Sequence, residues 1–97
     1  MNETIEKILA GIDKGTYFDS HFVIDTVIRN HSDAYLTFAA SHKAKDKVTE
    51  YVHSEIAKVI SLFEDEDKGL VKRVERAESL SFNIRGNASK CALWVKV

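Results

Sequence analysis

The sequence predicts one α+β domain covering residues 1–97, with three or four helices followed by a C-terminal antiparallel β-hairpin or three-stranded ribbon. Two observations support this fold class. Apolar residues recur at the three- and four-residue spacing of a helix face as far as Phe63. From Leu80 onwards they alternate with polar residues, as one face of a strand requires. A chain of 97 residues is long enough to bury a core without disulfide or metal.

The strand-like segment predicts a hairpin with a definite register. Residues 70–74 are expected to form a strand leading into it. Apolar side chains of residues 80–84 and of residues 91–97 each occupy alternate positions. If the chain reverses through residues 86–89, both apolar sets face the same side of the sheet. The expected cross-strand pairs are then Ile84–Cys91, Phe82–Leu93 and Leu80–Val95.

The first half of the chain divides at capping residues and glycines. Asn2 is expected to cap a first helix, which two glycines end by Gly15. A short extended piece over residues 16–18 follows. Asp19 or Ser20 is then expected to cap a second helix, because their side-chain oxygens can accept from the first free backbone N–H groups.

The second helix is expected to break at residues 30–33 and to continue to Ala40. After a polar link, Asp46 is expected to cap the strongest helix of the chain. The acidic run of residues 64–67 is expected to end that helix in a solvated turn, since it lacks the alternating ligands of a calcium-binding loop. The apolar stripe along this helix consists of Val48, Tyr51, Val52, Ile56, Val59, Ile60 and Phe63.

Composition indicates a soluble cytoplasmic protein. Hydrophobic residues make up 44% and charged residues 30% of the chain, and its apolar runs are too short to cross a bilayer, so no membrane association is expected. The N-terminal residues lack the basic and then apolar order of a signal peptide. Cys91 is the single cysteine, expected to be a small buried thiol in a reducing compartment.

The net charge of −1 is unevenly distributed. Residues 68–97 contain seven Lys or Arg and two acids, a surplus of five positive charges. Residues 1–67 contain seven bases and thirteen acids, a surplus of six negative charges. This division suggests that the C-terminal third meets an anionic partner. The alternative is that the basic side chains simply coat an exposed hairpin.

The order of helix, short strand, helices and β-ribbon resembles the winged helix-turn-helix superfamily. The resemblance is carried by residues 16–20 as a short strand entering a capped helix, by residues 46–63 in the place of the recognition helix, and by residues 70–97 in the place of the wing. The link from Ile28 to Asp46 is longer than the three or four residues of a tight helix-turn-helix. The resemblance implies a DNA-binding or transcription-regulatory module without catalytic activity, which places a helix in the major groove and a wing against the backbone or minor groove.

The resemblance also assigns candidate DNA contacts. In the expected register Arg85 faces Lys90, and a phosphate between them would relieve the repulsion, although both side chains could instead extend into water. Glu50 would repel phosphate, and a net charge of −1 gives little long-range attraction to DNA. The helix contacts are Lys45, Lys47, Thr49, His53 and Ser54, and the wing contacts are Arg73, Arg76, Arg85 and Lys90.

A protein-interaction adaptor of the same type, which does not bind DNA, is the alternative function. Trp94 is then a candidate partner anchor, unless it covers the first helix, and a homodimer is a further alternative. We expect no enzyme, cofactor or metal site. The four histidines stand ten or eleven residues apart, and there is no triad, paired carboxylate or phosphate-binding loop.

Overall fold

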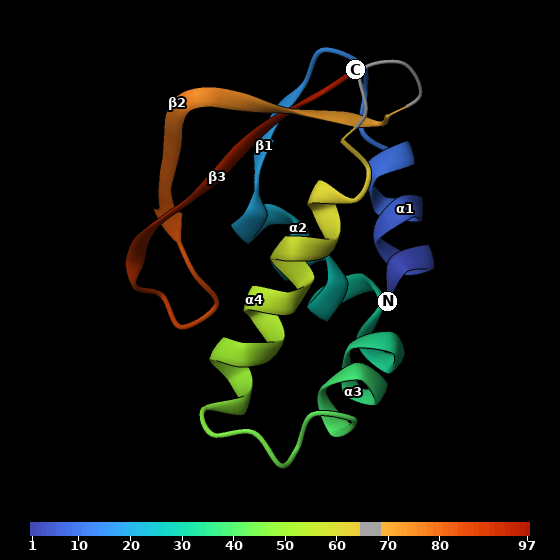
Figure 1. The fold of residues 1–97 in the computed structure, drawn as a ribbon, viewed down its shortest axis with the longest axis vertical. Helices are drawn as coiled ribbons and strands as arrows, with labels where there is room; N and C mark the ends of the chain where they lie inside the picture. The colour runs from blue at the N-terminus through green and yellow to red at the C-terminus, as the bar shows by residue number, and fades with distance from the viewer. Residues whose placement is uncertain (65–68) are drawn as a thin grey trace.

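The computed structural model describes residues 1–64 and 69–97, and within these it has four helices and a three-stranded antiparallel sheet (Figure 1). The helices precede the two long strands, which confirms the α+β class. Most of the acidic run 64–67 lies outside the described residues, so its expected turn is not assessed. The elements are α1 (Asn2–Ala10), β1 (Tyr17–Asp19), α2 (Ser20–Asn30), α3 (Ser32–Ala40), α4 (Val48–Ser61), β2 (Val71–Phe82) and β3 (Ala88–Lys96).

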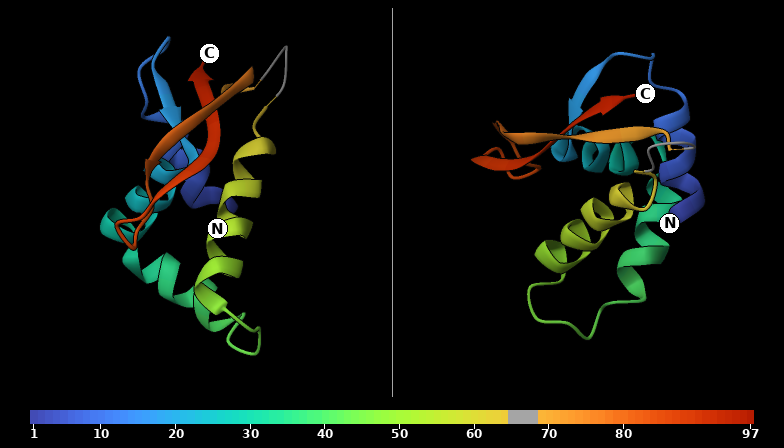
Figure 2. Two further views of the ribbon diagram at one scale, coloured as in Figure 1. Left: turned by 90° about the vertical axis from the view of Figure 1, so that its left-hand side faces the viewer. Right: turned by 45° about the horizontal axis from the view of Figure 1, so that its top comes forward.

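The sheet has the order β1-β3-β2, so the last strand lies in the middle. The short extended piece expected at residues 16–18 is strand β1, and it pairs with β3 through Tyr17–Val95, Phe18–Trp94 and Asp19–Leu93. The C-terminal segment itself is a two-stranded hairpin, in which the strand expected at residues 70–74 is the start of β2, and the third strand of the sheet is β1. Figure 2 shows the sheet on one side of the helices, with the β2–β3 hairpin extending beyond them.

The predicted register of the β2–β3 hairpin is wrong. Leu80 pairs with Lys90 and Phe82 with Ala88, so the chain reverses through residues 83–87 instead of residues 86–89. The turn is set by Asn83, whose side-chain oxygen accepts hydrogen bonds from the backbone N–H groups of Arg85 and Asn87. The observed register differs from the predicted one by an odd number of residues. Leu80 and Phe82 therefore no longer share a face with Cys91, Leu93 and Val95. Leu80 and Phe82 are therefore 70% and 73% exposed.

An irregularity in β2 bends this strand sharply. The register shifts between Arg73 and Glu78, and Arg76 within this bulge has a left-handed backbone with φ of 58°. In Figure 1 the strand turns a corner at about this point. A bent, bulged edge is a poor template for pairing with another sheet, so the bulge protects the free edge of β2.

The core lies between α1, α2, α4 and the sheet. Helix α4 provides Val52, Ile56 and Ile60, which are fully buried and belong to the predicted apolar stripe. Among the described residues, α3 contributes only partly buried side chains, so it covers the end of the core. None of the helices in the described part of the chain has the length and apolar character that crossing a bilayer needs. The other core side chains include Ile5, Leu9, Phe18, Val23, Val27, Val71 and Trp94.

Helix caps follow the sequence prediction at only one of three positions. Asp19 caps α2, with its Oδ1 accepting from the backbone N–H of Phe22 at 2.8 Å. Asn2 is already inside α1, preceded by Met1 at the cap position. Helix α4 begins at Val48 instead of after Asp46, because Lys47 adopts a left-handed backbone and redirects the chain. The predicted caps at Asn2 and Asp46 are therefore wrong.

A buried lysine joins the last strand to the first helix. Lys96 is only 9% exposed, and its Nζ donates to the carbonyl oxygens of Leu9, Ala10 and Ile12 at 2.9, 3.4 and 2.8 Å. A positive charge at the C-terminal end of a helix complements both the free carbonyls and the helix dipole. The apolar stem of the side chain lies along the core. Lys96 is thus a C-terminal cap for α1.

We predict that Lys96→Met destabilises the protein by about 2 kcal/mol, because it removes the Nζ donor from the partly buried carbonyl groups of Ala10 and Ile12. Urea unfolding followed by circular dichroism measures the change. Lys90→Met is the matched control, since Lys90 is exposed on the same strand and its replacement should cost less than about 0.5 kcal/mol. Equal stability of the two variants would contradict the capping role.

Candidate functional site

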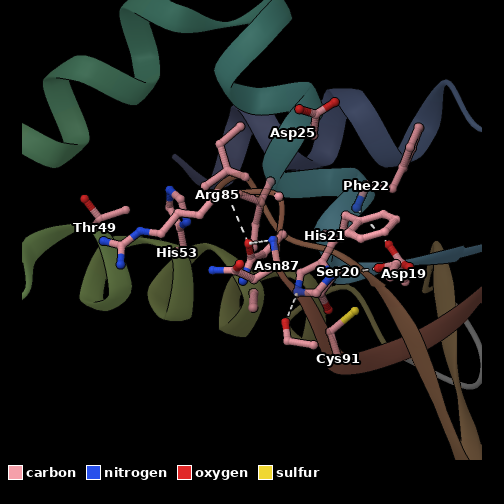
Figure 3. Close-up of a pocket in the computed structure, with 18 of the residues that line it drawn as sticks. Asp19, Ser20, His21, Phe22, Asp25, Thr49, His53, Arg85, Asn87 and Cys91 are labelled. Carbon is pink, nitrogen blue, oxygen red and sulfur yellow. Dashed lines mark hydrogen bonds between the residues drawn. The ribbon is translucent and has the colours of Figure 1, made fainter.

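A cleft of about 840 Å³ opens between α2, α4 and the tip of the β2–β3 hairpin. Its walls are the first turns of α2, the N-terminal half of α4 and residues 81–91 of the hairpin. Figure 3 shows two groups of polar side chains in it. Thr49, His53 and Arg85 lie toward one end, and Asp19, His21 and Cys91 lie toward the other (Figure 3).

The candidate reading residues in and just before α4 have different surroundings. Lys47 and Ser54 are exposed, as a role in groove contacts requires. Thr49 is half-buried and lines the cleft together with Ser54. Lys45 lies over the ring of Tyr51, with Nζ 5.1 Å from the ring centroid. Lys47 and Ser54 are thus available to a partner, whereas Lys45 already contacts an aromatic ring.

His53 is half-buried and contacts a neighbouring helix. Its Nε2 lies 3.1 Å from the hydroxyl of Tyr35, which joins α4 to α3. Burial lowers the pKa of His53 below its ordinary value of 6.5, and the nearby Arg85 charge lowers it further, against an opposing effect of Glu50. The neutral imidazole is therefore favoured, which makes His53 a weak phosphate contact.

The hairpin tip touches α4 through an ion pair. Arg85 Nη1 lies 2.6 Å from Glu50 Oε1, and the two side chains are 55% and 48% exposed. Arg85 belongs to the loop, so the predicted opposition of Arg85 and Lys90 across the hairpin is wrong. Since the pair is exposed, it contributes only about 0–1 kcal/mol and can exchange for another anion.

The other candidate wing residues do not gather at the cleft. Arg73 stacks over the ring of Trp94 at 5.6 Å, and Arg76 and Lys90 are exposed on the two strands. Trp94 itself is 3% exposed, and its Nε1 donates to Ser20 Oγ at 3.2 Å. The ring therefore covers α2 inside the core and is not an accessible partner anchor. The predicted residues that line the cleft are Thr49, His53, Ser54 and Arg85.

The second group of cleft residues was not predicted from the sequence. One potential ligand atom from each of Asp19, His21 and Cys91 lies within 4.8 Å of those of the other two. Cys91 is half-buried, so the predicted buried thiol is wrong in its degree of burial. The feature of the sequence that could have indicated this group is the spacing of small polar residues on the hairpin, where Ser79 and Ser81, and then Ser89 and Cys91, stand two residues apart. In the observed register, Ser79 faces Cys91 and Ser81 faces Ser89.

Three serines surround this group and hold two of its side chains. Ser79 Oγ donates to Asp19 Oδ2 at 2.6 Å. The two ring nitrogens of His21 lie 2.7 Å from Ser81 Oγ and 3.3 Å from Ser89 Oγ. A serine hydrolase triad would need a carboxylate on the second ring nitrogen, and here a serine occupies that position. Asp19 and His21 each form hydrogen bonds with serines in the cleft, but these bonds do not have the arrangement of a catalytic triad.

Asp19 is stabilised as a carboxylate. Its burial acts to raise the pKa, but hydrogen bonds from Ser79 and from the backbone N–H of Phe22 outweigh this effect. A hydrogen bond from Ser81 and the charge of His21 act in the same direction as these bonds. The pKa of Asp19 therefore lies below its ordinary value of 3.8.

Comparisons with known proteins identify no relative. No protein-family model matches the chain, and no curated protein or solved structure is significantly similar to it.

We predict that Asp19 makes the stability pH-dependent in acid. Because its folded pKa lies below the unfolded value, the carboxylate stabilises the fold above that value, and this contribution is lost as the pH falls through the folded pKa. Asp19→Asn keeps an oxygen that can cap α2 but cannot titrate. Urea unfolding at pH 7 and at about pH 3 should show a smaller loss of stability for this variant than for the wild type.

Ser79→Ala is the companion variant, since it removes one hydrogen bond that favours the carboxylate and should also reduce the acid-dependent loss. An unchanged pH dependence in both variants would show that Asp19 is not the responsible group.

Proposed function

We propose that this protein is a DNA-binding module of winged-helix type, in which α4 enters a groove and the β2–β3 hairpin lies against the flanking backbone. The observation that supports it best is the placement of the hairpin tip beside the N-terminal half of α4, where Arg85 contacts the exposed Glu50. A helix and an adjacent basic loop on one surface can together follow a groove and its phosphates. The order of elements and the pairing of β1 with β3 are consistent with this type of fold.

The charges of the surface define how such binding would behave. A net charge of −1 provides no long-range attraction to DNA, so affinity must come from local cations such as Lys47 and Arg85. Arg85 is already paired with Glu50, and a phosphate has to displace that carboxylate. Glu50 therefore acts as an internal competitor for the phosphate site. Removal of the Glu50 charge should therefore strengthen DNA binding.

We predict that Glu50→Gln tightens binding to a labelled duplex of mixed sequence by about fivefold at low salt, because it removes a local repulsion of ~1 kcal/mol and frees Arg85. Arg85→Ala should weaken binding and reduce its dependence on salt. Fluorescence anisotropy at two salt concentrations measures both effects.

The matched control is Glu3→Gln, which makes the same change in net charge on α1, remote from the cleft. Equal effects of the two glutamine substitutions would mean that only overall charge matters. Absence of binding at low salt by the wild type and by Glu50→Gln would refute the proposal.

Exposed apolar side chains on the hairpin favour the second candidate, a protein-interaction module. Leu80, Phe82 and Ile84 are 70%, 73% and 44% exposed within five residues of the chain. A concentrated exposed apolar surface is typical of a site that contacts protein. A second copy of the chain is the simplest partner to test, and it would also give a DNA-binding module the two-fold symmetry common among such proteins.

We predict that the wild type self-associates and that Leu80→Ser combined with Phe82→Ser abolishes this association, as measured by sedimentation equilibrium. Both side chains are mostly exposed, so the folded monomer should survive the change. The control combines Leu36→Ser with Leu62→Ser, which removes side chains of similar exposure from α3 and from the end of α4. A wild type that stays monomeric at high concentration would contradict the prediction.

A further inference from the structure

We propose that Asp19, His21 and Cys91 form a binding site for one zinc ion at the end of the cleft. The three side chains offer one oxygen, one nitrogen and one sulfur atom, all within 4.8 Å of one another. This mixed set suits zinc, which accepts carboxylate, imidazole and thiolate ligands together. The proposal stands on this juxtaposition and is independent of DNA binding.

The distances require only a local adjustment of side chains. Zinc bonds of about 2.0–2.3 Å in tetrahedral geometry place neighbouring ligand atoms about 3.5 Å apart. The donor atoms, within 4.8 Å of one another, must therefore approach by up to about 1.3 Å, which rotation of partly buried side chains can provide. The backbone positions are already fixed, because Asp19 and Cys91 lie on strands of one sheet and His21 lies in the first turn of α2.

The hydrogen bonds around the group are those that a metal site needs. A histidine ligand uses one ring nitrogen for the metal and usually donates from the other to a neighbouring group. Both ring nitrogens of His21 face serine hydroxyls, so one serine can keep its bond while the metal replaces the other. Asp19 likewise keeps its bond from Ser79. These contacts would orient the two ligands before the metal arrives.

The charges also match a divalent cation. The carboxylate of Asp19 and a thiolate at Cys91 together cancel the two positive charges of zinc. Metal binding would favour deprotonation of the thiol, since the thiolate is the form that coordinates. Three protein ligands would leave a tetrahedral zinc ion a fourth position that water can take, as in zinc sites that remain open to small molecules.

Without metal, the same residues would act as a polar clasp between the hairpin and α2. This is the competing explanation, because the serine contacts alone can join the two elements. The two explanations differ in what happens to Cys91 when zinc is added. A clasp leaves the thiol equally reactive, whereas coordination protects it.

The test uses the full chain, in which Cys91 is the single cysteine and reports this site alone. We expect zinc ions to slow the alkylation of Cys91 by iodoacetamide by more than about tenfold, and cobalt ions to give a thiolate-to-cobalt charge-transfer band at one ion per chain. His21→Gln should weaken the affinity for cobalt by more than about 100-fold, and Ser79→Ala by about tenfold. His31→Gln, which changes a histidine outside the cleft, should have no effect.

Circular dichroism of each variant without metal establishes that it is folded. Cys91→Ser provides a second, conservative variant, measured by zinc titration calorimetry, and it should lose the tight one-to-one site. The proposal is overturned if zinc leaves the alkylation rate unchanged, or if His21→Gln binds cobalt as the wild type does. Either result would leave the DNA-binding proposal untouched, because that proposal uses α4 and Arg85.

Discussion

The pairing of the short strand β1 with the last strand β3 is the constraint on which the rest of the structure depends. It joins residues 17–19 to residues 93–95 and places Phe18 opposite Trp94 in the core. Helix α2 begins directly after β1, so the same pairing fixes the start of α2 against β3. The hydrogen bond from Trp94 to Ser20 holds this junction. The group of Asp19, His21 and Cys91 lies at this junction.

The elements of the fold were predictable because each has a local signal. The apolar stripe of α4 and the side-chain oxygen of Asp19 act over one or two helical turns, and the sequence displays both directly. The register of the hairpin was not predictable from alternation alone. The observed turn has hydrogen bonds to the side chain of Asn83, a short-range feature that alternation does not reveal, and it leaves Leu80 and Phe82 exposed. The bulge at Arg76 then breaks the alternation a second time.

The candidate site was only half predictable for a related reason. Residues of α4 and the arginine of the hairpin tip could be named from the resemblance, and Thr49, His53, Ser54 and Arg85 do line one cleft. The group of Asp19, His21 and Cys91 depends on contacts between residues about seventy positions apart. Its recognition requires the correct hairpin register, which puts Ser79 and Cys91 side by side. Because the predicted turn lay at the wrong residues of the hairpin, the predicted register did not bring Asp19, His21 and Cys91 together.

Three of the seven cations of the C-terminal third make contacts within the molecule. Lys96 caps α1, Arg73 stacks on Trp94 and Arg85 pairs with Glu50. Net charge by segment therefore overstates the cations that an outside anion can reach. Among these three contacts, only the exposed ion pair of Arg85 and Glu50 can readily exchange for an outside anion, because both side chains stay hydrated. The affinity for an anionic partner should therefore depend more on this ion pair than on the net charge of the segment.

The capping of α1 by Lys96 has a consequence for folding during synthesis. Helix α1 leaves the ribosome before β3, yet the carbonyl groups of Ala10 and Ile12 receive the Nζ donor only after Lys96 has been added. An isolated helix of nine residues is marginal in water. Its final structure therefore waits for the last strand, and the nascent chain should behave as a single cooperative unit that closes late.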